Sequence, residues 1–290
     1  MVPAFDMYCG VDFSGAKLAG RNIWVASLVP GRRRLRLVAL DRLHTLAGTA
    51  DRSPAHAHLT DLILSSQSAL WGMDFPFGLP RELFPPRSSW ASQFEFLRGW
   101  DDRAYDCGLE FVRRARGLCP VTSGTPHRTA LHCRRLTDVE AKAPFDTFHY
   151  RLIYQTFFGM RDVIGRLRLD PTTAVLPFQY AKLPTAERVV VECCPSSVLK
   201  RLGLPHQNYK QPAGGPLTAI RRRTRHDILD WLRTEVIIPP TLERRMMRNP
   251  GGDALDAVIA GIGAARAVAT ADHAAIRRHP RYRHEGRLYV

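Results

Sequence analysis

The sequence lacks the patterns that mark exported, membrane-spanning and disulfide-bonded proteins. No stretch approaches the roughly 20 apolar residues of a membrane span, and Met1–Tyr8 contains an acidic residue but no apolar signal segment. The six cysteines include no C-x-x-C pair, and His132-Cys133 is not followed by a second pair of zinc ligands. We therefore expect a cytoplasmic protein with buried thiols.

Acidic residues are also few relative to basic ones. The 290 residues include 42 Lys and Arg but only 27 Asp and Glu, which gives a formal net charge of +15. Such a charge favours polyanions such as nucleic acid or an acidic membrane surface, although a general bias towards arginine would give the same balance. A hydrophobic content of 45% and this length allow one large core, with room for an inserted subdomain.

The first 80 residues predict an antiparallel meander followed by one crossover. Apolar and alternating runs indicate three strands, with a turn signal before the third. Apolar residues at helical spacing follow, and then a short buried strand ends at an acid. The predicted elements are strands over Met7–Phe13, Asn22–Val29, Leu35–Leu40 and Ala69–Asp74, and a helix over Pro54–Ser65.

Residues 81–187 differ in character because they are rich in arginine and in aromatic residues at helical spacing. We interpret this stretch as a helical insertion or cap, and residues 1–80 and 188–290 as the core that it interrupts. Aromatic residues of the insertion are expected to form its interior rather than a platform for stacked bases. They include Phe148, Tyr150, Tyr154, Phe157 and Phe158.

The core pattern resumes with a fifth strand at Arg188–Glu192, a basic helix over Thr218–Leu232 and a helix rich in small residues over Asp253–Ile262. The predicted fold class is therefore α/β, with a mixed five-stranded sheet flanked by helices and a helical insertion between strands four and five. Strands one and four lie side by side in such a sheet.

Acidic residues stand where apolar strands end. Asp12, Asp74 and Glu192 close the first, fourth and fifth strands, and Asp253 and Asp256 share one face of the last helix because they are three residues apart. An ionised carboxylate is costly in an apolar setting unless a cation meets it there. We expect these carboxylates to converge, although acids in a first helical turn can also merely complement the helix dipole.

Converging carboxylates favour a divalent cation, and their hard oxygen ligands suit Mg²⁺ or Mn²⁺. Two such ions roughly 3.5–4 Å apart can activate water and stabilise the leaving oxygen in phosphodiester hydrolysis. A basic surface around such a centre is suited to cutting a polyanion, so the sequence predicts a nuclease. The predicted metal ligands are Asp12, Asp74, Asp253 and Asp256, and Glu192 is a candidate fifth ligand or base.

Basic and hydroxyl side chains near these acids are candidates to bind substrate phosphate. Ser14 follows the first acid at a glycine-bounded turn, where it could bind phosphate or cap the turn. Lys17 in the same turn could equally be a solvated residue. Lys210, in a Gly/Pro-rich loop, could neutralise phosphate in the transition state or be solvated. The basic helix that follows adds Arg221, Arg222 and Arg225.

Four segments, taken in order, resemble a known family. They read G-V-D-F-S-G, G-M-D-F-P-F-G-L-P, V-E-C-C-P-S-S-V-L-K and G-G-D-A-L-D-A-V-I-A-G. Together they look like the predicted nucleases catalogued as domain of unknown function 429, which are assigned to the ribonuclease H-like superfamily. The likeness spans almost the whole chain and includes Arg135-Leu136-Thr137-Asp138 and the aromatic segment near Tyr154-Gln155-Thr156. It implies a ribonuclease H-like sheet.

The element order and the closing D-x-x-D also resemble the Holliday-junction resolvases of that superfamily. The resolvases typically carry glutamate where this chain has Asp74, so the shorter side chain would need closer approach of the metal or a bridging water. Glu192 lies outside the usual set of that superfamily, and Lys210 precedes the basic helix as a lysine does in the relatives. The residues that would hold metal by this resemblance are Asp12, Asp74, Asp253 and Asp256.

Two other classes of function stay open from the sequence. Sugar and acetate kinases use a similar first-strand acid and Gly/Ser turn to bind ATP, but they normally need two such domains, and the second glycine motif here, Ala213-Gly214-Gly215, is weak. A non-catalytic protein could keep the fold and bind nucleic acid, although four carboxylates repel a polyanion unless metal lies between them. Nucleic acid, and not a membrane, is the expected partner, and resolvases suggest a homodimer.

Overall fold

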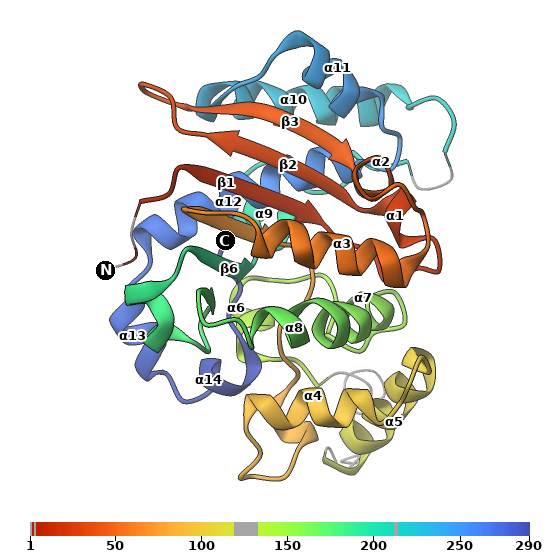
Figure 1. The fold of residues 1–290 in the computed structure, drawn as a ribbon. Coiled ribbons are helices and arrows are strands. Elements are labelled where there is room, and N and C mark those ends of the chain that lie inside the picture. Colours follow the sequence, from red (N-terminus) through yellow and green to blue (C-terminus); the bar gives the residue numbers. More distant parts are fainter. Residues whose placement is uncertain (1, 3, 119–132, 212–213) are drawn as a thin grey trace.

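A seven-stranded mixed sheet forms the centre of the protein, in the order β5-β6-β4-β1-β2-β3-β7 (Figure 1). β2 is antiparallel to β1 and β3, whereas the other neighbouring pairs are parallel. The strands are β1 (Met7–Asp12), β2 (Trp24–Val29), β3 (Leu35–Arg42), β4 (Ala69–Met73), β5 (Thr173–Val175), β6 (Arg188–Glu192) and β7 (Val236–Ile237).

The computed structural model describes residues 2, 4–118, 133–211 and 214–290. Cys119, His132 and Ala213, which entered the zinc and glycine-motif arguments, lie outside the described residues. Within those ranges, no helix is long and apolar enough to cross a membrane.

Helices surround the sheet and build the insertion. Those that follow core strands are α1 (Ala19–Asn22), α2 (Leu43–Ala47), α3 (Arg52–Leu64), α9 (Pro195–Arg201), α10 (Ala219–Glu235), α11 (Pro240–Arg248), α12 (Asp253–Thr270), α13 (His273–Arg278) and α14 (Tyr282–Glu285). Those between β4 and β5 are η1 (Arg81–Leu83), α4 (Trp90–Arg98), α5 (Ala104–Leu118), α6 (Leu136–Glu140), α7 (Ile153–Phe158), η2 (Gly159–Ile164) and α8 (Gly165–Leu167), and η3 (Tyr180–Thr185) follows β5.

The five predicted strands all form, but the prediction of a five-stranded sheet was wrong by two strands. β5 and β7 have three and two residues, which is too short for an alternating pattern to stand out. β5 extends the sheet beyond β6 and lies inside the stretch predicted as insertion, so the helical insertion ends before it, between β4 and β5.

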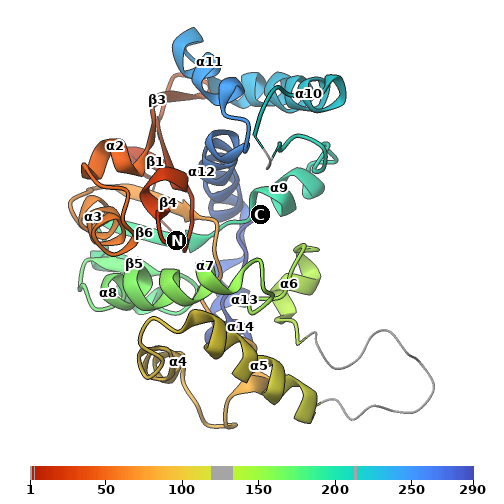
Figure 2. The same ribbon diagram turned by 90° about the vertical axis from the view of Figure 1, so that its right-hand side faces the viewer.

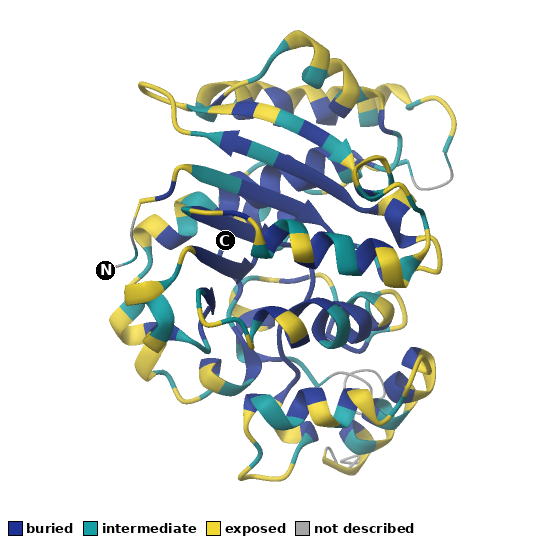
Figure 3. Ribbon diagram, in the orientation of Figure 1, coloured by how far each residue is buried: buried dark blue, intermediate teal, exposed yellow. Residues whose placement is uncertain are grey.

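The two faces of the sheet carry different layers, which the edge-on view shows with α3 on one side and α12 on the other (Figure 2). Val11 and Met73 pack into the core that contains Leu59 of α3 and the buried residues of the insertion. Leu70 and Val191 pack into the second core, with α10 and α12. Figure 3 shows the resulting pattern, in which the central strands are buried and the outer helices are exposed on their far sides.

Two glycines let α12 lie directly on the sheet. Gly10 of β1 is paired with Gly72 of β4, and both face α12. A Cβ atom on Gly10 would lie 1.9 Å from the carbonyl oxygen of Ala257, and one on Gly72 would lie 2.6 Å from that of Ala260. The small side chains of the helix and the two bare glycines therefore set the distance between α12 and the strand ends.

We expect Gly10→Ala to destabilise the protein by about 1–3 kcal/mol, because the methyl group must displace the backbone of α12. Gly117→Ala is a matched control, since an added Cβ there meets no atom within 4 Å and alanine favours helix by about 0.5–1 kcal/mol. Urea unfolding of both variants gives the comparison. An unchanged midpoint for Gly10→Ala would contradict the close packing of α12.

The insertion has an aromatic interior, as predicted for part of its aromatic residues. Phe148, Phe157 and Phe158 are buried in the core shared with α3. Tyr150 and Tyr154 are instead 65% and 42% exposed. The spacing argument therefore holds for the phenylalanines but not for the two tyrosines.

Candidate metal site

The register of β1 and β4 brings two of the predicted acids together. Asp12 and Asp74 lie two residues after the paired glycines, and side chains two residues apart share a face of a sheet. The backbone N–H of Asp74 donates to the carbonyl of Val11 at 2.9 Å, which continues the strand pairing to this point. Both carboxylates therefore face α12.

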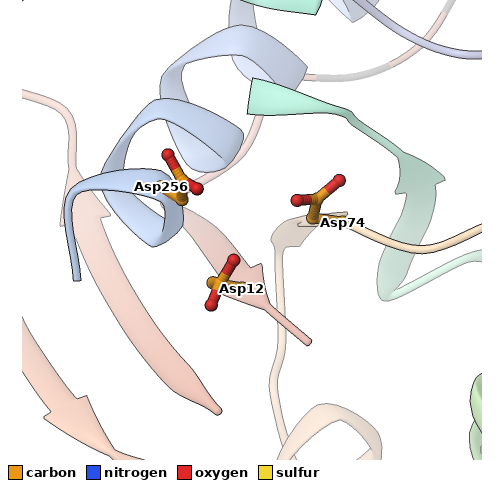
Figure 4. A group of neighbouring side chains, drawn as sticks. All are labelled: Asp12, Asp74 and Asp256. Atoms are coloured by element: carbon orange, nitrogen blue, oxygen red, sulfur yellow. The ribbon is translucent and has the colours of Figure 1, made fainter. Parts of the chain in front are cut away.

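The helix α12 supplies the third carboxylate. Asp256 lies one turn into α12 and is 1% exposed. Within the described residues, Asp12, Asp74 and Asp256 form a group whose ligand oxygens all lie within 4.8 Å of one another. Figure 4 shows the three side chains reaching the same space from two strand ends and one helix. This carboxylate triad, as we call these three residues, could hold a metal ion.

The start of α12 is fixed by local backbone structure. Gly252 precedes the helix with φ 87°, a conformation that favours glycine, and the Asn249 side chain accepts from the N–H of Ala254 at 3.2 Å. Asp253, at the first position of the helix, lines the same cleft as the triad but is not a member of it. The structure thus brings together three of the four predicted metal ligands and leaves the fourth beside them.

Burial and mutual repulsion make the ionised triad costly. Burial is the main cause that raises the pKa of Asp12 well above its usual range, with Lys210 opposing and Asp256 adding to the rise. Burial, followed by the charge of Asp256, raises the pKa of Asp74 to about 7. Burial also raises the pKa of Asp253. A cation at this point would offset these costs.

The raised pKa of Asp74 predicts that metal-free protein loses stability as the pH rises. A carboxyl whose folded pKa is about 7 and whose unfolded pKa is about 3.9 binds more protons in the folded state between these values. Its stabilising effect is full below about pH 4 and is lost as the pH rises through 7. Thermal unfolding in EDTA from pH 5 to 8 should show the melting temperature falling, and Asp74→Asn should reduce that slope. An identical slope in the variant would contradict the assignment.

Lys210 and Tyr209 both contact Asp256. The Lys210 ammonium forms an ion pair with one carboxylate oxygen of Asp256, and the Tyr209 hydroxyl donates to the other at 2.9 Å. Burial would lower the pKa of Lys210, but Asp256, Tyr209 and Asp12 together raise it well above its usual range. Lys210 therefore stays protonated and is the cation nearest the triad among the contacts that the structure shows.

Arg225 holds the loop of Lys210 in place instead of binding solvent or phosphate. Its side chain is fully buried and donates to the carbonyls of Tyr209 (2.6 Å), Asn249 (2.7 Å) and Pro250 (2.6 Å). These bonds join the loop before α10 to the turn before α12. The predicted phosphate contact at Arg225 does not fit this placement, because its donors are occupied by backbone.

Glu192 lies on the opposite face of the sheet from Asp74. It is paired with Met73 in the register of β4 and β6, so it points away from α12. Its carboxylate accepts from both terminal nitrogens of Arg135, at 2.5 and 2.8 Å, and Arg135 also donates to Asp138 at 2.7 Å. The structure thus gives Glu192 an arginine partner and leaves it outside the triad, although Glu192 lines the same cleft.

Of the other predicted phosphate ligands, two line the cleft and two do not. Ser14 lines the cleft and its hydroxyl accepts from the N–H of Ala16 at 3.3 Å, as a turn cap does. Arg221 lines the cleft too and donates to Gln211. Lys17 and Arg222 are exposed and are not among the cleft residues.

The triad lies in a cleft of about 760 Å³ between the core and the insertion. The core side carries the triad and the loop with Lys210, and the insertion side carries Phe145, Arg151 and Gln155. The Gln155 side chain donates to the carbonyl of Phe13, the residue after Asp12, and thereby ties the two sides together.

Sequence reasoning missed three residues of this region. Tyr209 stands beside the predicted Lys210, but nothing in its spacing indicates a carboxylate partner. Arg135 and Gln155 lie in segments that carried the family resemblance, Arg135-Leu136-Thr137-Asp138 and Tyr154-Gln155-Thr156. From the sequence, Arg135 could line a phosphate channel or lie on a solvated helix face, and neither interpretation indicates a buried partner of Glu192.

The fold and the site together define an α/β protein with a seven-stranded mixed sheet and a buried carboxylate triad that could hold a metal ion. The chain belongs to the family described as "Protein of unknown function (DUF429)", whose model matches residues 10–281. No curated protein and no solved structure matches the chain.

Proposed function

We propose that this protein is a nuclease that hydrolyses phosphodiester bonds of DNA or RNA with Mg²⁺ or Mn²⁺. The observation that carries the proposal is the carboxylate triad, whose oxygens lie within 4.8 Å of one another. Three carboxylates are a hard oxygen donor set that suits these ions. Their burial and the raised pKa values of Asp12 and Asp74 fit a site completed by positive charge.

In this proposal, each residue of the site has a distinct role. Asp12, Asp74 and Asp256 would hold the metal, and Asp253, which lines the same cleft, would help to hold a second ion. The bound metal would activate water and stabilise the leaving oxygen. Lys210 would add an ammonium group beside Asp256, where it could stabilise charge on a phosphate.

The order of the central strands supports a ribonuclease H-like placement. β1, β2 and β3 form an antiparallel meander, and β4 and β6 follow on the other side of β1, as the resemblance to that superfamily implies. The net charge of +15 supports a polyanionic substrate.

A panel of labelled DNA and RNA substrates, single-stranded, duplex and branched, tests the proposal in Mg²⁺, Mn²⁺ or EDTA. We expect cleavage with either metal and none in EDTA. ATP is included in the panel, because metal-dependent ATP turnover without nucleic-acid cleavage would support a phosphotransferase instead. Binding of nucleic acid without cleavage under any metal would support a non-catalytic binding protein.

Lys210→Met should separate metal binding from catalysis. Removing the ammonium frees Asp256, so we expect Mn²⁺ to bind up to about fivefold tighter, the effect of a partly exposed ion pair. Cleavage should nevertheless be about 10²–10³-fold slower, because the group that stabilises phosphate charge is gone. Calorimetric titration with Mn²⁺ and the cleavage assay give the two values. If the Lys210→Met variant cleaves at the wild-type rate, Lys210 is only a structural partner of Asp256.

A further inference from the structure

The insertion carries a group of aromatic side chains with an arginine, of which Phe145 and Arg151 line the cleft and His149 and Tyr150 line a neighbouring pocket. We call Phe145, His149, Tyr150 and Arg151, between α6 and α7, the aromatic ledge. Phe145 and His149 are stacked with ring centroids 4.4 Å apart and an interplanar angle of 21°, and His149 and Tyr150 are also 4.4 Å apart. The Arg151 guanidinium lies 5.8 Å from the Phe145 ring and 5.6 Å from the Tyr150 ring.

The core of the insertion does not account for this ledge. The phenylalanines that fill that core are buried, whereas Tyr150 is 65% exposed and Phe145 is half-buried against the cleft. Phe145 and Arg151 both line the cleft that contains the triad. One aromatic ring and one guanidinium group are thus available inside the cleft that contains the carboxylates.

The ledge is fixed in position relative to the triad from both ends. Before it, Arg135 is held by Glu192 at the end of β6. After it, Gln155 bonds to the carbonyl of Phe13, next to the first carboxylate. The Lys200 ammonium of α9 adds a bond to the carbonyl of Lys142 within the segment, at 2.6 Å. Such anchoring preorganises a binding surface, which lowers the entropic cost of binding.

The two sides of the cleft match the two parts of a nucleotide. The carboxylate side, with metal bound, would take the phosphate, and the ledge offers a ring and a guanidinium plane on which a base can stack. A cleft of about 760 Å³ is also of the size that encloses a small ligand, for which about 300–1,000 Å³ is typical. A base inside a continuous duplex is stacked on its neighbours and cannot present its face to the ledge.

We infer that the substrate is nucleic acid with an unpaired nucleotide at the scissile phosphate, whose base stacks on Phe145 and Arg151. This inference rests on the proposed nuclease function and names its substrate class. Single strands, flaps and loops satisfy it, and an uninterrupted duplex does not.

Fluorescence anisotropy with a labelled 12-nucleotide single strand and the matching duplex tests the inference. The protein carries Asp12→Asn to prevent turnover, with and without Phe145→Ala. We expect Phe145→Ala to weaken single-strand binding about 5- to 100-fold, the effect of losing one stacked base, and to leave duplex binding within twofold. Phe145→Trp should restore single-strand binding. Tyr105→Ala is the control, since Tyr105 is 52% exposed and lines the neighbouring pocket together with His149 and Tyr150, but does not line this cleft.

Equal loss of single-strand binding in the Phe145→Ala and Tyr105→Ala variants, or no loss in either, would overturn the inference, and so would failure of Phe145→Trp to restore it. Melting temperatures confirm that each variant is folded. The wild-type cleavage panel keeps the two proposals distinguishable. Cleavage of duplex and single strand at equal rates, unaffected by Phe145→Ala, would contradict base binding by the ledge but support the nuclease function. Selective, Phe145-dependent binding of single strands without cleavage in any metal would contradict the nuclease function. It would still support the ledge as a binding site for unpaired bases.

Discussion

Asp12→Asn is expected to abolish metal-dependent cleavage and, at the same time, to stabilise the metal-free protein at pH 8. The loss of one metal ligand removes several kcal/mol of transition-state stabilisation, and each 1.4 kcal/mol is tenfold in rate, so cleavage should fall by about 10³-fold or more. Stability should rise because the variant removes one of three clustered carboxylates. The ionised form of Asp12 is costly, since its own burial raises its pKa well above the usual range and Asp256 adds to the rise. We expect a gain of about 1 kcal/mol or more in EDTA.

The measurement is thermal unfolding of wild type and variant in EDTA and in Mg²⁺, beside the cleavage assay. Wild type should gain melting temperature when Mg²⁺ is added, because a ligand that binds only the folded state stabilises it, and Asp12→Asn should not. Asp227→Asn is a matched control, since Asp227 is an exposed acid on α10. If Asp12→Asn cleaves at the wild-type rate, the triad is not the catalytic centre, even if the protein is a nuclease.

The sequence predicts the triad better than it predicts the surroundings of the triad. Asp12 and Asp74 each follow a short apolar strand, and each lies two residues after a glycine, so their common face follows once β1 and β4 are paired. Glu192 ends a strand in the same manner, but its position in the register of β6 places it on the other face. Periodicity shows which side chains of one strand share a face, whereas the register between strands depends on the whole sheet.

The helical spacing around Arg225 predicts a buried position, although its charge suggests an exposed one. Arg225 is three, four and seven residues before Ile228, Leu229 and Leu232, all of which are buried, so it lies on the apolar face of α10. Its partners are backbone carbonyls from two loops, and no residue type in those loops reveals them. The sequence therefore could have excluded Arg225 from the surface, but it could not have shown what Arg225 binds.

Arg135→Met is expected to cause the largest loss of stability among the substitutions considered. Arg135 is 1% exposed and forms ion pairs with Glu192 and Asp138, which are themselves buried. Without the guanidinium, two carboxylates stay in the interior with no cation, and breaking a buried ion pair in this way costs about 3–5 kcal/mol. Urea unfolding at pH 7.5 measures the loss. Arg222→Met, at an exposed position of α10, should change stability by less than about 0.5 kcal/mol.

The partner substitution shows whether Glu192 serves structure or metal. Arg135→Met with Glu192→Gln removes one of the unpaired charges, so the double variant should regain part of the lost stability. Glu192→Gln alone should keep the Mg²⁺-induced rise in melting temperature, because Glu192 lies on the opposite face of the sheet from Asp74 and is bonded to Arg135. Loss of that rise in Glu192→Gln, at a Mg²⁺ concentration that shifts wild type, would make Glu192 a metal ligand after all. Retention of the rise would leave Glu192 as the anchor that holds Arg135, and with it the segment that carries the aromatic ledge, against the end of β6.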